Sequence, residues 1–146
     1  MNLHSPHSKR HPAKSGSAPS RARAGGTVNA EVVNDRAKLI MHRIAARRLA
    51  REPQALLEAA RRVLQEERER GPAYRYLDEW EQLLNVEPAR LRSILTERSE
   101  RMTWLRSTSP FGRVLGLTDP VLRRRIWRLA RTGAELAPAP HTGRAA

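Results

Sequence analysis

The sequence predicts an all-α protein, a compact bundle of five or six helices that follows a disordered basic tail. Apolar residues recur about once per helical turn from Asn34 to Gly133. No segment alternates apolar and polar residues for long enough to form a strand. Prolines and glycines separate the periodic segments, as they do at helix boundaries. We therefore expect one helical domain over residues 31–133 and a disordered tail over residues 134–146.

Residues 1–30 combine Ser, Pro, Gly, Ala, Lys, Arg and His with almost nothing to bury. Such a segment cannot recover the conformational entropy that ordering costs, so we expect it to be disordered. It contains five Lys and Arg residues and no acid, and so contributes strongly to the formal net charge of +13. Its histidines, His4, His7 and His11, are interpreted as solvated side chains, and no metal site is predicted.

The first helix is predicted to begin at Asn34 or Asp35, whose side chains suit a helix cap. Pro53 should end it and open the second helix, where a missing N–H is harmless. Gly71 and Pro72 stop the second helix. The inward faces of the two helices are expected to consist of apolar residues: Ala37, Ile40, Met41, Ile44, Ala45, Leu56, Leu57, Ala60, Val63 and Leu64.

The third helix is predicted over residues 73–85, and Asn85 is expected to take the left-handed conformation that often ends a helix. The next segment, residues 88–106, fits either one long helix or two pieces broken near residues 96–99. The apolar side chains expected to face inward here are Tyr76, Trp80, Leu83, Leu84, Leu91, Ile94, Leu95, Met102 and Leu105.

Residues 105–120, LRSTSPFGRVLGLTDP, form a connector between helical segments. Pro110 disfavours helix at Ser109, and Phe111 is expected to return to the core. Gly112 and Gly116 permit unusual backbone angles. The final helix is expected to start from Thr118 or Asp119 as cap, with Pro120 first, and to end at Gly133. Its predicted inward residues are Leu122, Ile126, Leu129 and Ala130.

Residues suited to catalysis are few. The chain contains no cysteine, and His42 is the only histidine in the predicted helical domain. We expect His42 to be a surface or partly buried structural residue, and the acidic run Glu66, Glu67 and Glu69 to be a solvated face. The glycines follow no phosphate-cradling spacing. The sequence therefore predicts a non-enzymatic protein without a cofactor.

Nucleic-acid binding is the alternative function. The segment WEQLLNVEPARLRSIL has the outline of a helix-turn-helix in which Arg90 and Arg92 project from the second helix. Acidic residues lie close by, and similar corners recur in small helical proteins, so a plain interhelical corner stays open. Stacking on single-stranded RNA needs exposed aromatic rings, and the candidates are Tyr74, Trp104, Phe111 and Trp127. Packing inside the fold is the better interpretation for most of these rings.

The chain lacks an apolar run of about 18 residues, the length that a membrane-spanning helix needs. Its basic start is not followed by the apolar stretch of a secretory signal. We therefore expect a cytoplasmic protein without membrane contact.

A family resemblance covers residues 36–131. The order of LIMHRIAARRL, EPQALLEAARRVL, YLDEWEQLL, ERMTWLRSTSPFGRVL and RRIWRLAR resembles a group of small all-helical bacterial proteins of uncertain function. These carry an Arg-x-x-Ser-Pro-Phe-x-x-Val-Leu signature and are associated with antitoxin-like or accessory genes beside a separate effector. The resemblance implies a protein partner encoded by a neighbouring gene. The basic tail and the segment GLTDPVLRRR depart from the group's pattern.

The predicted partner-binding surface combines the loop between Arg106 and Phe111 with the arginine-rich start of the last helix. Arginine and tryptophan suit interfaces because they offer planar hydrogen bonding and a large contact area. Burial of the loop as a lid on the core is the competing interpretation. The oligomeric state is left open. The residues assigned to the surface are Arg106, Ser109, Pro110, Phe111, Arg123, Arg124, Arg125 and Trp127.

Overall fold

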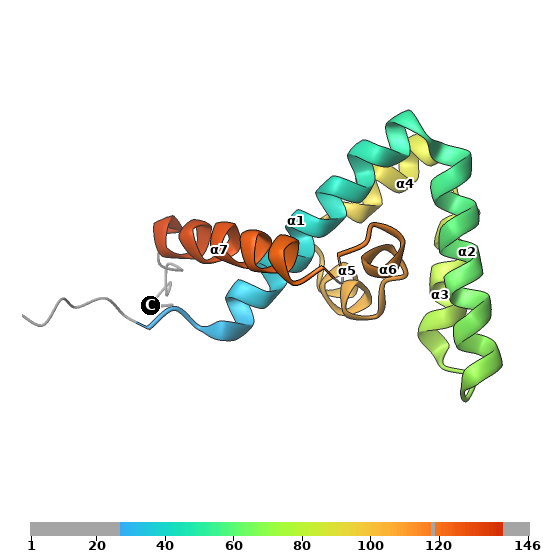
Figure 1. Cartoon of the computed structure of the whole chain (residues 1–146), viewed down its shortest axis with the longest axis horizontal. Coiled ribbons are helices and arrows are strands. Elements are labelled where there is room, and N and C mark those ends of the chain that lie inside the picture. Colours follow the sequence, from blue (N-terminus) through green and yellow to red (C-terminus); the bar gives the residue numbers. More distant parts are fainter. Residues whose placement is uncertain (1–26, 118, 139–146) are drawn as a thin grey trace, which may run out of the picture.

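A computed structural model describes residues 27–117 and 119–138 (Figure 1). These residues form seven α-helices and one 3₁₀ turn, with no strand, so the predicted all-α class is confirmed. Most of the predicted basic tail, Thr118 and residues 139–146 lie outside the described residues. The elements are α1 (Ala30–Arg51), α2 (Pro53–Arg70), α3 (Arg75–Leu84), α4 (Pro88–Leu95), α5 (Glu100–Leu105), η1 (Arg106–Thr108), α6 (Phe111–Val114) and α7 (Pro120–Leu136).

The longest helix, α1, connects the two ends of the fold (Figure 1). Its first half is crossed by α7, and its second half lies along α4. The hairpin of α2 and α3 stands at the far end, and α5, η1 and α6 lie between this hairpin and α7. None of the described helices has both the length and the apolar character that crossing a membrane requires.

The main core is a cluster of fifteen buried residues that come from α1 to α6. None of them belongs to α7, which packs onto α1 and buries only Ile126 and Ala130. Burial of apolar surface is the dominant stabilising term in folding, so α1 to α6 supply most of the stability. The members of the cluster are Ala45, Leu49, Leu56, Leu57, Ala60, Leu64, Leu77, Trp80, Leu83, Leu84, Leu91, Leu95, Met102, Leu105 and Phe111.

The first helix begins at Ala30, four or five residues before the predicted start at Asn34 or Asp35. Asn29 is its cap, and the Asn29 side chain accepts a hydrogen bond from the backbone N–H of Glu31 at 2.9 Å. Asn34 and Asp35 lie inside the helix, so their assignment as caps is wrong. The extra turn forms because Val33 is buried, which extends the inward face toward the N-terminus. The second helix begins at Pro53 as predicted.

The segment after Pro88 forms two helices, which decides between the two predicted alternatives. The chain leaves α4 at Thr96, and α5 begins after Ser99, whose hydroxyl accepts a hydrogen bond from the N–H of Met102. Asn85 ends α3 in the right-handed helical region, at φ −90° and ψ −6°, and not in the predicted left-handed conformation. The corner between α3 and α4 is therefore made without a left-handed residue at that position.

The last helix starts where the sequence predicts but ends later. The Asp119 carboxylate accepts a hydrogen bond from the N–H of Val121 at 3.0 Å, and Pro120 is the first helical residue. The helix continues to Leu136, so the first residues of the predicted C-terminal tail are helical. Leu129 is 57% exposed, contrary to prediction. With α1 as the main partner of α7, the buried stripe is narrower than in a helix inside a bundle.

Candidate functional site

Arg106 does not lie on an exposed surface. Its side chain is buried, and its guanidinium donates hydrogen bonds to the carbonyls of Leu95 and Glu97, just past the end of α4. Carbonyls at a helix C-terminus lack intrahelical donors and carry partial negative charge, which a cation satisfies. Burial lowers the pKa of the Arg106 guanidinium. The assignment of Arg106 to a partner surface is therefore corrected to a capping role.

The rest of the predicted loop also faces the core. Pro110 and Phe111 are buried, and Ser109 is half-buried. Phe111 packs edge-on against Trp80, with ring centroids 6.0 Å apart, and against His42 at 6.3 Å. The lid interpretation fits these three residues better than the binding interpretation, because a partner cannot reach buried side chains.

His42 is completely buried and joins α1 to this lid. Its Nδ1 lies 2.6 Å from the carbonyl oxygen of Lys38, and its Nε2 lies 2.7 Å from the hydroxyl oxygen of Ser109. A carbonyl only accepts, so Nδ1 carries the proton and Nε2 accepts from the Ser109 hydroxyl. Burial lowers the pKa of His42 to about 4. The ring is therefore neutral at physiological pH.

A serine hydroxyl bonded to a histidine is the arrangement of an activated nucleophile. Here the base is too weak to take a proton near neutral pH, because its pKa is about 4. The ring is stacked on Trp80 and contacted by Phe111, and the Ser109 oxygen also accepts the N–H of Phe111. The arrangement thus supports a structural role for His42 and Ser109, holding the lid against α1.

The surface of α7 that α1 leaves uncovered, which we call the outer face, carries several exposed apolar side chains. Among the described residues, four of the seven exposed large hydrophobic side chains lie on this helix: Val121, Trp127, Leu129 and Leu136. Arg123, Arg124 and Arg125 are also exposed, as predicted. The guanidinium of Arg131 lies over the Trp127 ring, 5.7 Å from the centroid. Of the predicted surface, α7 therefore remains accessible, with Leu129 added to it.

A shallow notch of about 300 Å³ lies where α7 meets α1. Its floor is apolar and includes Met41, Leu117 and Ile126. Trp127 lines it together with the cationic side chains of Lys38 and Arg123. The notch therefore combines an apolar lining with cationic side chains at its edge.

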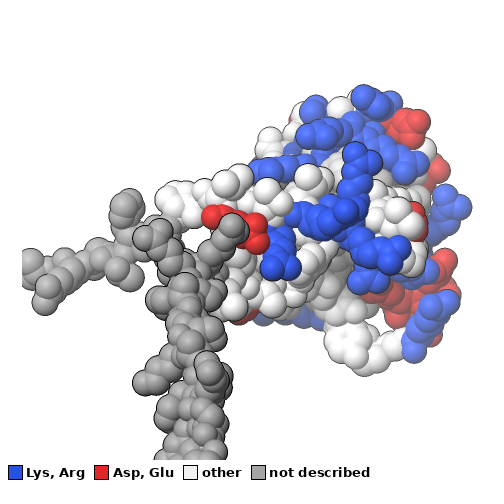
Figure 2. All heavy atoms as spheres, turned by 60° about the vertical axis from the view of Figure 1, so that its left-hand side comes forward, with Lys and Arg blue, Asp and Glu red and all other residues white. Residues whose placement is uncertain are grey.

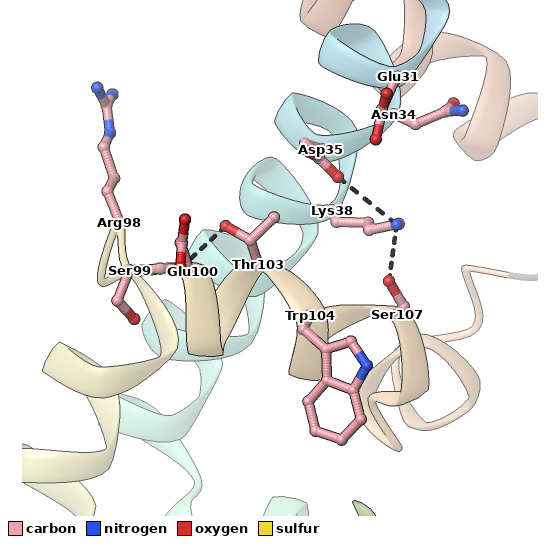
Figure 3. Close-up of a pocket in the computed structure, with 10 residues that line it drawn as sticks. All are labelled: Glu31, Asn34, Asp35, Lys38, Arg98, Ser99, Glu100, Thr103, Trp104 and Ser107. Carbon is pink, nitrogen blue, oxygen red and sulfur yellow. Dashed lines mark hydrogen bonds and ion pairs between the residues drawn. The ribbon is translucent and has the colours of Figure 1, made fainter.

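A larger cleft of about 640 Å³ lies between α1 and α5 (Figure 3). Lys38 from α1 forms an ion pair with Asp35 at 3.7 Å and donates a hydrogen bond to the Ser107 hydroxyl at 2.9 Å. Trp104 is half exposed, and its ring points away from Lys38, while Arg98 extends out of the cleft. Lys38, the lysine of this cleft, is therefore already paired.

Arg90 and Arg92 of the predicted helix-turn-helix are both exposed on α4. The Arg92 side chain lies against α1, where its Nε donates a hydrogen bond to the carbonyl of Ala46 at 3.1 Å. Here α3 packs on α2, whereas α4 packs on α1. Arg92 is thus placed beside the arginines of α1, a grouping that the sequence analysis did not include. Its sequence signal is the spacing of Arg43, Arg47 and Arg51, four residues apart.

Charge is unevenly distributed over the surface. Figure 2 shows Lys and Arg spread over the upper and middle parts of one face, with the densest group of Asp and Glu at its lower right and smaller groups at the left and the upper right. The described residues contain no group of three His, Cys, Asp or Glu side chains arranged to hold a metal ion.

No family model, curated protein or solved structure matches this chain.

Proposed function

We propose that the protein works by binding a protein partner through the outer face of α7. The observation that carries this proposal is the concentration of exposed Val121, Trp127, Leu129 and Leu136 on one helix. Exposed apolar side chains bordered by polar residues mark interaction surfaces. At the helical repeat of 3.6 residues, Val121, Leu129 and Leu136 project from one side of α7 and Trp127 from the other, so the partner contacts both sides of the helix. Ile126 and Ala130 are the buried residues of α7, so covering α1 does not account for the exposed apolar side chains.

The arginines of α7 define the chemistry of the partner. The structure gives Arg123, Arg124, Arg125 and Arg128 no carboxylate partner among the described residues. A partner surface with apolar side chains and carboxylates would contact both kinds of group. The family resemblance supports a partner encoded by a neighbouring gene, and so an antitoxin-like or accessory role in the cytoplasm.

The test is co-expression with the product of the adjacent gene, followed by calorimetric titration of the purified proteins. Trp127→Ala and Leu129→Ala should each weaken binding by about tenfold or more, as truncation of an interface anchor does. Trp104→Ala is the matched control, because Trp104 is similarly exposed but lies on α5. If Trp104→Ala weakens binding as much as Trp127→Ala does, α7 is not the binding surface.

A further inference from the structure

A row of arginines follows the second half of α1. Arg43, Arg47 and Arg51 are exposed and four residues apart, so they project from one side of the helix. At 1.5 Å per residue, successive members are about 6 Å apart along the axis.

Two hollows lie beside this row. The first, of about 410 Å³, runs between α1 and α4 and is lined by Arg43, Arg47 and Arg92 with the hydroxyl residues Ser93 and Thr96. The second, of about 560 Å³, is lined by Arg47, Arg48 and Arg51 together with Ile44 and Glu52. Arg47 lines both hollows, so they form one continuous basic surface, which we call the arginine groove.

The charges of the arginine groove are not neutralised within the fold. No described carboxylate forms an ion pair with Arg43, Arg47 or Arg92. Glu52, the single acid that lines either hollow, pairs with Arg48 at 3.6 Å. The hydrogen bond from Arg92 to the Ala46 carbonyl holds a third guanidinium at the α1 side of the groove. The groove therefore presents several preformed cationic donors to one ligand.

Helix stabilisation does not account for these residues. Basic side chains in the last turn of a helix interact favourably with its C-terminal carbonyls, which explains Arg48 and Arg51. Arg43 and Arg47 lie before that turn, and the effect falls off within it. Arg43 also stands near the buried Arg106, whose pKa its charge helps to lower, so its position does not favour the fold electrostatically.

The lining of the arginine groove points to phosphate oxygens. Guanidinium groups bind phosphate through two parallel hydrogen bonds, and hydroxyls add further donors. No aromatic side chain lines either hollow, whereas proteins that hold single strands rely on stacked rings. We propose that the arginine groove binds the phosphate backbone of a nucleic-acid duplex without reading its base sequence. This site is separate from the outer face of α7.

The test measures binding of the full-length protein to a short fluorescent duplex of arbitrary sequence by anisotropy over a series of salt concentrations. The variant Arg43→Ala/Arg47→Ala is compared with Arg62→Ala/Arg70→Ala. The control loses the same charge from exposed residues of α2 that have no ion pair among the described residues. Thermal unfolding establishes that both variants keep the parent fold.

Each lost phosphate contact lowers the slope of log affinity against log salt by about 0.9 for B-form DNA. The groove variant should therefore reduce the slope by about 2 and the affinity at low salt by about tenfold or more, while the control leaves the slope unchanged. Equal losses in the two variants would mean that net charge alone attracts the duplex, and would overturn the proposal. Equal binding of an unpaired strand, with an equal loss in the groove variant, would overturn the duplex assignment.

Parallel titrations with DNA and RNA duplexes identify which backbone the groove takes. A duplex of changed base sequence should bind with the same affinity, because the contacts are to phosphates. A strong dependence on base sequence would contradict this backbone contact and would favour readout by α4.

Discussion

At the residue scale, Arg106 shows how a charged side chain can serve the core. Its guanidinium closes the end of α4 through the carbonyls of Leu95 and Glu97. Arg106→Ala leaves these carbonyls without their donors, so we expect a loss of about 2 to 3 kcal/mol in unfolding free energy, measured by urea titration. Arg106→Lys should recover part of the loss, because an ammonium keeps the charge but not the planar fork.

Arg123→Ala serves as the control for this effect. Arg123 is exposed on α7, and surface substitutions of this kind change stability by about 0.5 kcal/mol or less. Similar losses in the Arg106 and Arg123 variants would show that the hydrogen bonds of Arg106 do not stabilise α4.

The burial of His42 makes the unfolding free energy of the protein depend on pH, which the sequence alone does not predict. The pKa of His42 is lowered from 6.5 to about 4 in the fold, mainly by burial, and the nearby Arg106 charge acts in the same direction. Between these two values the unfolded chain binds a proton that the folded chain does not. The stability from neutral His42 is therefore complete above pH 6.5 and is lost as the pH falls toward 4.

The expected loss across this window is about 3 kcal/mol of unfolding free energy, from about 1.4 kcal/mol for each unit of pKa difference. Urea unfolding at a series of pH values measures it. In His42→Gln the slope of stability against pH should become shallower across the window, while the contributions of the carboxylates remain. An unchanged slope in this variant would show that His42 does not titrate as its burial implies.

At the element scale, the two glycines of the connector have different roles. Gly116 has a φ of +65°, which side-chain-bearing residues rarely adopt, and no atom lies within 4 Å of a Cβ placed there. Gly112 lies inside α6, and a Cβ there would stand 3.6 Å from the sulfur of Met41, an ordinary contact. Gly116→Ala should therefore destabilise by about 1 to 2 kcal/mol through the backbone.

Gly112→Ala should be neutral or stabilise by up to about 1 kcal/mol, because alanine favours helix. Thermal unfolding of the two variants measures both effects. Sequence alone does not distinguish the two glycines, because the sign of φ depends on the path of the chain around each of them. A loss in Gly112→Ala equal to that in Gly116→Ala would contradict the assignment of backbone strain to Gly116.

Helix starts are predicted well where a proline stands at the first helical position. Pro53 and the pair Asp119 and Pro120 set the starts of α2 and α7 as expected, because these signals act within one turn. The start of α1 was missed because it depends on the burial of Val33, which is a property of the packed structure. Leu129 was placed inward because periodicity gives the side of a helix but not the width of the partner that covers it.

The candidate site is also predicted only in part from the sequence, because burial depends on packing. Trp127 and the arginines of α7 are exposed as expected, whereas Arg106 and Phe111 are buried. Arginine and aromatic residues are common at interfaces, but their planar groups also pack well inside a core. Residue type alone therefore does not decide between the two locations. The arginine groove escaped prediction because Arg92 joins Arg43 and Arg47 only through the packing of α4 on α1.

At the scale of the whole molecule, acidic and basic side chains are concentrated on different helices. Acids outnumber bases along the α2 and α3 hairpin, whereas arginines predominate in α7 and in the second half of α1. Arg68 of α2 forms ion pairs with two residues of α3, Asp78 at 2.8 Å and Glu81 at 2.7 Å, which connect the two helices of the hairpin. The basic elements remain free to attract acidic partners, with a strength that falls as salt rises.

Helix α7 is also separate from the core, because none of its residues belongs to the main buried cluster. A chain ended after Leu117 should therefore keep a cooperative unfolding transition, with a lower midpoint because Ile126 and Ala130 no longer cover α1. Circular dichroism during heating measures both properties, and the same chain should lose the partner that binds α7. A broad, non-cooperative transition would show that the core needs α7 in order to fold, and would contradict this prediction.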